Sequence, residues 1–279
     1  SHSPSVTADY NLLADKHLEI KKQLNENTYG VPIFIESTIE EQSQRGDVYG
    51  IIHHPFNMVK PAFSHAKDWC DIAPLHLNIK ACTYQKLNGD YQLTLYSGRK
   101  FFEEPEDTYQ LVYRYHLDNT QENYINATLS TQKGPLGTSG YNISAEAIPL
   151  NNNKTFIHFS YSYKQGFWAR FAMETYLATI GRNKVGFTVI DNDINGDPVY
   201  IDGMRGVIER NAMRYYFAIQ AYLDTRSLDP EKIFIARLNH WFDLTEQHHK
   251  QLYEMEKKDY LDYKQRERVE QNRIQQELK

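Results

Sequence analysis

The sequence predicts an α+β protein in which a curved antiparallel β-sheet wraps around a long helix. Six strand-like segments follow one another between residues 77 and 164, polar turns separate them, and residues 166–180 then switch to helical spacing. Apolar side chains alternate with period two in successive segments joined by short connections, which is typical of an antiparallel meander with one buried face. A chain of 279 residues has enough apolar material for a substantial core.

We expect the six strands at residues 77–84, 91–96, 108–117, 124–132, 141–150 and 154–164. Turn-forming residues lie between them, among them Asn88-Gly89-Asp90 and Asn151-Asn152-Asn153. In four of the strands the alternation assigns one face to Tyr109, Leu111, Tyr113, Tyr115 and Leu117; to Ile125, Ala127 and Leu129; to Ile143, Ala145 and Ala147; and to Ile157, Phe159, Tyr161 and Tyr163.

The segments that precede this meander predict a helix and then a strand pair. Residues 9–25 carry Leu12, Leu13, His17, Ile20 and Leu24 at helical spacing. Apolar runs at 31–35 and 46–52 predict two strands. Two short helices follow, one opening after His54-Pro55-Phe56 and one around 68–72 that stops near Pro74.

After the meander we expect a hairpin from 185–190 and 199–201, a helix over 205–223, and another from Asp229-Pro230 through Trp241. The charge-balanced tail from Thr245 predicts a solvated helix. These elements suggest an N-terminal helical extension over 1–30, a main domain over 31–225 and a C-terminal helical extension over 226–279.

Composition limits the class of partner and leaves the compartment open. The net charge of −5 argues against a nucleic-acid binder, and the sequence has no apolar run long enough to span a membrane. Cys70 and Cys82 form either a single disulfide or two buried free thiols. Ser1-His2-Ser3-Pro4 resembles a processed or artificially added end, so a removed signal peptide is compatible with the sequence. We expect a periplasmic or secreted protein, with a cytoplasmic one as the alternative.

The order of elements from about Gly46 to Gly181 resembles the START-like (SRPBCC, helix-grip) superfamily, as represented by an uncharacterised bacterial member. The resemblance rests on a strand that feeds a helix through His54-Pro55-Phe56, on Trp69-Cys70-Asp71-Ile72 before the next strand, and on the six strands and helix that follow. It implies a space between sheet and helix that holds a lipid, a sterol or another apolar molecule, and no shared catalytic set.

The leading functional hypothesis is therefore a non-catalytic carrier or sensor of a lipid-like molecule in an internal cavity. It requires residues 77–164 to coil around Gly166–Ile180 with room left inside, and another position for that helix would contradict it. The same side chains could equally be ordinary core. The candidate ligand-binding residues are Tyr113, Tyr115, Leu129, Phe159, Tyr161, Phe167, Phe171 and Met173.

Other groups of residues suggest chemistry less specifically. Asp191, Asp193, Asn195, Gly196, Asp197 and Asp202 imitate part of a calcium loop, but a hairpin turn explains them better. The histidines at 53–54, 240 and 248–249 do not have chelating spacing. Arg205, Glu209, Arg210 and Arg214 favour a salt network, with an anionic-headgroup site as the alternative.

The sequence thus predicts no catalytic residue, no metal ligand and no cofactor. His116, Glu146 and His158 are acid–base groups that the alternation places on the outward face. Two alternatives stay open: a cyclase- or hydrolase-type enzyme on the same fold, and a helical interaction module that forms a homodimer through its C-terminal helices.

Overall fold

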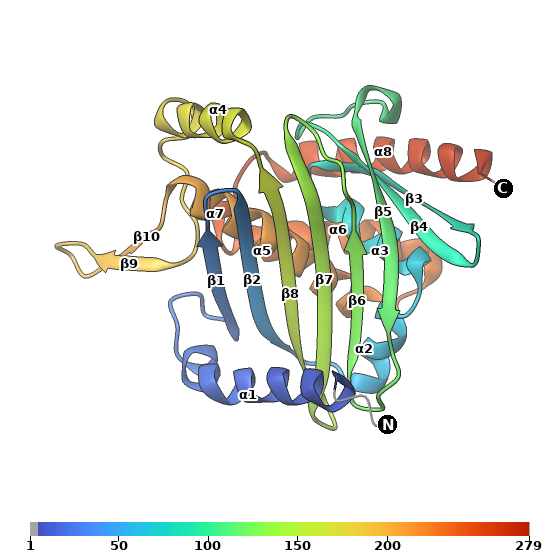
Figure 1. Ribbon diagram of the computed structural model, residues 1–279, viewed down its shortest axis with the longest axis horizontal. Helices are drawn as coiled ribbons and strands as arrows, with labels where there is room; N and C mark the ends of the chain where they lie inside the picture. The colour runs from blue at the N-terminus through green and yellow to red at the C-terminus, as the bar shows by residue number, and fades with distance from the viewer. Residues whose placement is uncertain (1–4, 279) are drawn as a thin grey trace.

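A computed structural model describes residues 5–278 and shows one large antiparallel sheet with helices on both faces (Figure 1). The eight strands of the sheet are β1 (Ile33–Ile39), β2 (Ser43–Ile52), β3 (Ile79–Leu87), β4 (Asp90–Ser97), β5 (Tyr109–Asp118), β6 (Ile125–Ser130), β7 (Thr138–Asn151) and β8 (Lys154–Gln165). Their spatial order is β1-β2-β8-β7-β6-β5-β4-β3. The six predicted meander strands and the strand pair before them are therefore confirmed.

The helices and remaining elements follow the predicted succession. They are α1 (Ser5–Asn25), α2 (Phe56–Phe63), α3 (Ala66–Ile72), α4 (Phe167–Ala178), α5 (Gly203–Thr225), α6 (Pro230–Glu246), α7 (His249–Leu252) and α8 (Lys257–Glu277), with 3₁₀ turns at Ala73–Leu75 and Pro105–Asp107 and a separate hairpin of β9 (Val189–Asn192) and β10 (Pro198–Tyr200).

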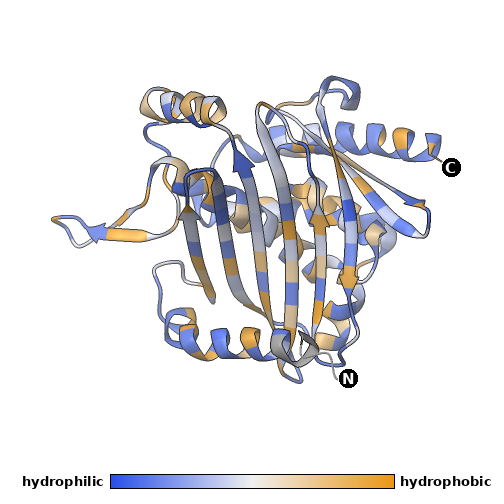
Figure 2. Cartoon of the chain, viewed as in Figure 1, coloured by the Kyte–Doolittle hydropathy of each residue, from blue (hydrophilic) through white to orange (hydrophobic). Residues whose placement is uncertain are grey.

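The pairing of β2 with β8 joins the first strand pair to the end of the meander. Val48 lies opposite Phe159 and Gly50 opposite Ile157 in this pairing, while α2 and α3 lead from β2 to β3 at the far edge. Hydrophobic and hydrophilic bands alternate along the strands (Figure 2). The sheet can therefore bury one set of side chains against a helix and turn the other set outward.

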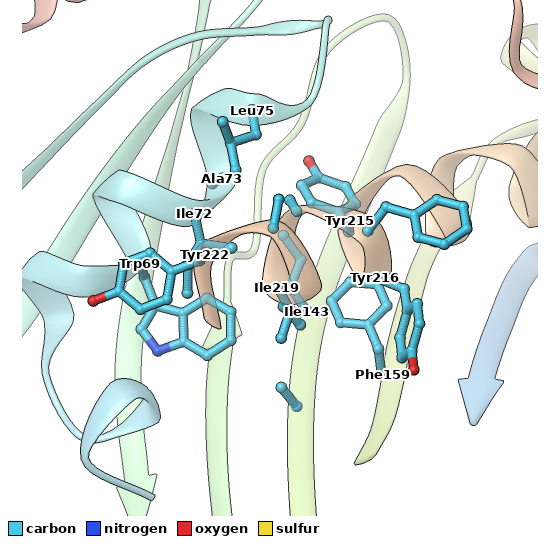
Figure 3. Close-up of a cluster of buried hydrophobic side chains, with 14 of the residues drawn as sticks. Trp69, Ile72, Ala73, Leu75, Ile143, Phe159, Tyr215, Tyr216, Ile219 and Tyr222 are labelled. Carbon is cyan, nitrogen blue, oxygen red and sulfur yellow. The ribbon is translucent and has the colours of Figure 1, made fainter. Parts of the chain in front are cut away.

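The helix enclosed by the sheet is α5. Its side chains Tyr216 and Ile219 are fully buried; Tyr216 lies beside Phe159 of the sheet, and Ile219 lies near Ile143, with Ile72 and Trp69 of α3 beyond it (Figure 3). Glycines on β2 allow this close packing: a Cβ atom on Gly50 would lie 2.5 Å from Cζ of Tyr216. The predicted class, an α+β helix-grip fold around a long helix, is confirmed.

The prediction that Gly166–Ile180 is the enclosed helix is wrong. This segment forms α4, which lies across the end of the sheet beyond the last residues of β8 (Figure 1). Phe167 of α4 is 73% exposed, and Leu177 is the one residue of this helix that is buried. The 12-residue α4 buries a single residue although most of its side chains are apolar, whereas the 23-residue α5 carries buried residues on all its sides, as expected for a core helix.

A second, smaller core lies on the convex face of the sheet. There α1 covers outward-facing aromatic residues, and the cluster comprises Leu13, Ile20, Leu24, Tyr49, Tyr124, Ile148 and Phe156. The predicted N-terminal amphipathic helix is confirmed, although Ser1-His2-Ser3-Pro4 lies outside the described residues.

The charged C-terminal segment is helical but not solvated all round, so that part of the prediction is wrong. Helix α8 packs on β3 and α6 and buries Tyr260 and Lys264. Gln271 accepts a hydrogen bond from the Cys82 amide (2.8 Å) and donates one to the Cys70 carbonyl (3.1 Å). Gln275 makes the equivalent pair with the amide (2.9 Å) and carbonyl (3.1 Å) of Tyr84. The polar helix thus satisfies backbone groups of a sheet-edge strand.

Cys70 and Cys82 form a disulfide, which joins α3 to β3. This bond resolves the alternative that the sequence left open. Within residues 5–278, none of the helices has the length and apolar character needed to cross a membrane.

Candidate functional site

A cleft of about 590 Å³ opens at the end of the sheet, between α4, the adjoining ends of β7 and β8, and the first turns of α5. We call it the rim cleft. Its lining residues are Pro135, Leu136, Thr138, Tyr141, Tyr161, Tyr163, Gln165, Trp168, Ala169, Ala172, Met173, Tyr176, Val207 and Asn211. These residues are mostly apolar or aromatic, without a charged group, as in sites that bind apolar ligands.

Three tyrosines from adjacent strands form one wall of the rim cleft. The rings of Tyr141 and Tyr163 are stacked with centroids 5.1 Å apart, and Tyr161 lies 6.2 Å from Tyr141 and 5.8 Å from Tyr163. Burial raises the pKa of all three phenols above its ordinary value, so they stay neutral at physiological pH. The wall therefore offers ring faces and neutral hydroxyl groups to a ligand.

The opposite wall is α4, which polar contacts hold at the sheet end. The Gly166 amide donates to the Gly137 carbonyl (3.1 Å) where the helix begins. The Arg170 guanidinium donates to the carbonyls of Glu40 (3.2 Å) and Glu41 (2.7 Å) in the β1–β2 turn. The few apolar contacts of α4 leave Trp168 77% exposed beside the rim cleft.

A second cleft, of about 500 Å³, adjoins the first and has several charged side chains in its lining. The two share Met173, Tyr176, Val207 and Asn211. We call the second one the cationic cleft, because it is also lined by Arg99, Lys100, Lys184, Arg210 and Arg214 with a single acidic residue, Glu254; Leu77, Asn78 and Phe101 complete it.

The charges of the cationic cleft converge on Glu254, in the loop before α8. Its carboxylate accepts hydrogen bonds from Lys184 (2.8 Å), Lys100 (3.3 Å) and Arg214 (3.4 Å). Burial alone would raise the pKa of Glu254, but the hydrogen bond from Lys184 and the nearby positive charges outweigh it and lower the pKa. Arg210 donates to the Val185 carbonyl (3.0 Å). One carboxylate therefore faces a surplus of positive charge.

The structure distributes the eight sequence-predicted ligand residues over several environments. Tyr161 and Met173 line the rim cleft. Tyr113, Leu129 and Phe159 are buried in the packed core between the sheet and α5. The remaining three are Tyr115, which donates to the Phe63 carbonyl (2.8 Å), and Phe167 and Phe171, which line a separate groove beside Glu41 and Arg170.

The predicted arginine cluster on 205–214 divides into two groups. Arg210 and Arg214 line the cationic cleft. Glu209 points away from it, is fully buried, and accepts hydrogen bonds from the amides of Phe187 and Thr188 (2.8 Å each) and from the Ser37 hydroxyl. Arg205 donates to the same Ser37 hydroxyl (2.9 Å). Sequence reasoning did not identify Lys100, Lys184 and Glu254, which come from connections far apart in the chain.

The calcium-like residues form the tip of the β9–β10 hairpin, the alternative that we favoured. The Asp193 carboxylate accepts from the amides of Asn195 (2.8 Å) and Asp197 (2.9 Å), and Asp202 precedes α5 as its N-cap residue. Of the predicted histidine groups, His54 and His240 contact the same carboxylate, Asp224 (2.6 and 2.7 Å). Within residues 5–278, no three His, Cys, Asp or Glu side chains form a group that could hold a metal ion.

The outward placement of His116, Glu146 and His158 is confirmed, but His158 is nearly buried. Its ring bonds to Glu146 (2.8 Å) and Asp47 (2.7 Å) and stacks on Tyr49 at 4.2 Å. Burial lowers the pKa of His158, but the hydrogen bonds to the two carboxylates outweigh burial and raise it. This network lies on the convex face, away from both clefts.

Sheet, enclosed helix and clefts together define an α+β helix-grip protein with an apolar cleft at the rim. Among solved structures, the chain is similar to a conserved protein of unknown function from Enterococcus faecalis (13% identity over 76% of this chain and 91% of that one, TM-score 0.37). It is also similar to norcoclaurine synthase from Thalictrum flavum (15% identity over 52% of this chain and 80% of that one, TM-score 0.36). A third similar structure is an aromatase/cyclase from Streptomyces sp. R1128 (10% identity over 74% of this chain and 94% of that one, TM-score 0.34). No family model matches the chain, nor does any curated protein.

Proposed function

We propose that this chain binds a lipid-like or other hydrophobic small molecule in the rim cleft, without transforming it, as a member of the START-like superfamily. The observation that carries the proposal is the cleft itself, a site of about 590 Å³ walled by Tyr141, Tyr161, Tyr163 and Trp168. Transfer of apolar ligand surface from water to such walls stabilises a complex by about 25 cal/mol per Å². Of the predicted ligand residues, Tyr161 and Met173 belong to this site.

This site replaces the cavity expected between the sheet and residues 166–180. The side chains of Leu129, Phe159 and Tyr216 fill the space between the sheet and α5, each at most 3% exposed. A ligand would therefore lie at the end of the sheet, between α4 and the ends of β7 and β8, and not along the enclosed helix α5.

The charged groups beside the rim cleft favour binding over acid–base catalysis. A general acid or base works best with a pKa near the operating pH. Interactions with Lys184 and its neighbours lower the pKa of Glu254, while burial lowers that of Arg214 to about 10. These groups keep fixed charges at neutral pH, so they can position a ligand but are poorly suited to transferring protons.

Substitution of Ala172 by Trp tests the proposal, because Ala172 lines the rim cleft from α4 and a large side chain there would fill it. The probe is dodecanol below its solubility limit, and the readout is protection of the exposed Trp168 from acrylamide quenching. We expect saturable protection in the wild type and at least a tenfold loss of affinity in Ala172→Trp. Because the added indole raises fluorescence, calorimetric titration provides a second readout.

Ala178→Trp is the matched control, since Ala178 lies on the same helix outside the cleft lining. It should bind dodecanol like the wild type. Equal affinity in wild type and Ala172→Trp, or no binding in the wild type, would contradict the proposal.

We propose further that the protein works in an exported, oxidising compartment, supported by the disulfide between Cys70 and Cys82. Alkylation of thiols under denaturing conditions, immediately after isolation from the native cell, tests this. Full protection of both cysteines supports export, whereas two modified thiols would contradict it and favour a cytoplasmic location.

A further inference from the structure

The rim cleft and the cationic cleft adjoin through four shared residues. Val207 and Asn211 contribute one side of the junction from α5, and Met173 and Tyr176 contribute the other side from α4. A single elongated molecule can therefore lie in both. Its apolar part would contact the tyrosine wall and its other end would reach Arg210 and Arg214.

Positive charge is concentrated at that second end. Lys100, Lys184, Arg210 and Arg214 line the cationic cleft with Glu254 as the acidic member, and the fifth cation, Arg99, pairs with Glu103 (3.4 Å). The whole chain carries a net charge of −5, so this local excess runs against the overall charge. Such an excess in a concave site attracts anions.

Arg214 has hydrogen-bonding capacity that the protein itself leaves unused. Its side chain is 6% exposed, and its contact with Glu254 is a single long bond of 3.4 Å from Nη2. Its Nε is buried without a hydrogen-bond partner among the described residues. A guanidinium has five N–H donors, and a buried charge is costly when it is incompletely paired. An acceptor from a ligand would complete this pairing.

Arg210 and Arg214 are placed to hold one anionic group together. They lie four residues apart on α5 and are therefore on the same face, about 6 Å apart along the helix axis. Arg210 also donates to a backbone carbonyl and to no carboxylate among the described residues. Two guanidinium groups at this spacing can contact different oxygens of the same carboxylate or phosphate.

We infer that the ligand is an anionic amphiphile, with a carboxylate or phosphate head group bound by Arg210 and Arg214 and an apolar tail in the rim cleft. This inference rests on the proposed function, because it assumes that the rim cleft holds the tail. It adds the chemical class of the ligand and the residues that select it.

The test compares three ligands with the same tail, each titrated into the full chain: dodecanoate and dodecyl phosphate below their critical micelle concentrations, and dodecanol below its solubility limit. The readout is Trp168 quenching, supported by calorimetry. Charge-assisted hydrogen bonds favour the anions, so we expect at least tenfold tighter binding of one or both anions than of dodecanol in the wild type. The preferred anion identifies the head group as carboxylate or phosphate.

Two variants assign the preference to the arginines. Arg210→Gln and Arg214→Lys should each reduce anion affinity about tenfold or more and leave dodecanol affinity within about twofold. Arg214→Lys keeps the positive charge beside Glu254, which guards against unfolding. Arg226→Gln is the matched control, because this arginine lies at the other end of α5 and contacts Met58; it should bind all three ligands normally.

The outcomes separate the inference from the proposed function. If dodecanol and the anions bind the wild type equally, or if both variants keep the anion preference, the head-group inference is overturned while the apolar cleft stands. If none of the three ligands binds, the proposed function fails and the inference fails with it.

Discussion

Gly50 of β2 lies directly beneath Tyr216 of α5, so close that a methyl group on Gly50 would overlap the tyrosine hydroxyl. The contact fixes which helix the sheet encloses. Gly50→Ala should destabilise the protein by about 2–3 kcal/mol, because an overpacked core must shift to accommodate the added carbon. Urea unfolding measures this change.

Gly46→Ala is the comparison for this prediction. A methyl group on Gly46 would lie 3.1 Å from the Ile208 carbonyl and 3.2 Å from Cβ of Ala212, a tight but less severe contact. Its loss of unfolding free energy should be the smaller of the two. A Gly50→Ala protein as stable as the wild type would contradict the packing of α5 on β2.

Glu254→Gln should lower the free energy of unfolding at pH 7 by about 1–3 kcal/mol, because Arg214 and Lys184 lose their charged partner. The pKa of Glu254 is lowered in the folded protein. Its contribution is therefore present above its unfolded-state pKa of about 4.5 and is lost as the pH falls through the lower folded value. Urea unfolding at pH 7 and at pH 3 measures this, and the difference between wild type and Glu254→Gln should be smaller at pH 3. Glu256→Gln, in the same loop but exposed, should have little effect.

His158→Gln should destabilise the protein more at pH 6 than at pH 9. Hydrogen bonds to Asp47 and Glu146 raise the pKa of His158 against the effect of burial. The stabilisation is complete below the unfolded-state pKa of about 6.5 and is lost as the pH rises through the folded value. We expect an additional loss of about 1–2 kcal/mol at pH 6. His116→Gln, an exposed control on the same face, should have little effect on stability, and an equal effect of His158→Gln at both pH values would contradict the charged network.

Lys80→Met should stabilise the protein at pH 7, because the cost of the buried charge exceeds the contribution of the one hydrogen bond that Lys80 donates to the Leu77 carbonyl (3.0 Å). Lys80 and Lys264 share one carboxylate, Glu267, and burial lowers the pKa of Lys80 from 10.5 to about 8. The cost of its buried charge is complete below pH 8 and disappears as the pH rises toward 10.5. We expect a gain of about 1–2 kcal/mol in thermal or urea unfolding that shrinks over this interval.

Lys264→Met should have the opposite effect. Lys264 donates to the carbonyls of His76 (2.9 Å) and Ile79 (3.0 Å) and to Glu267 (3.0 Å). Its loss leaves three buried acceptors without this donor and should destabilise the protein by about 3 kcal/mol or more. If Lys80→Met and Lys264→Met changed the free energy of unfolding equally, the prediction that only the Lys80 charge is destabilising would be contradicted.

Local periodicity was sufficient to predict the strands but not the helix that they enclose. Period-two alternation marks β5 to β8, in which buried and more exposed side chains alternate along much of the strand. Residues 166–180 are predicted to be the enclosed helix because they follow β8 directly, as the resemblance to the START-like superfamily implies. The continuous apolar run from Tyr215 to Ile219 is the better indicator, since five consecutive apolar residues span more than one helical turn and place apolar side chains on all sides of the helix.

The candidate site was only partly predictable for a different reason. Arg210 and Arg214 were recognisable because helical spacing places them on one face. Glu254, Lys100 and Lys184 have no spacing relation to them, and tertiary packing alone brings them together. The same applies to Gln271, whose partners Cys70 and Cys82 lie about 190–200 residues earlier.

Two glutamines of α8 cover backbone groups at the outer edge of strand β3. Strand β3 is the last in the sheet order, and an uncovered edge strand is a template for pairing with another chain. Gln271 and Gln275 imitate a neighbouring strand at the amides of Cys82 and Tyr84. A chain shortened before residue 257 would therefore be prone to self-association by strand addition.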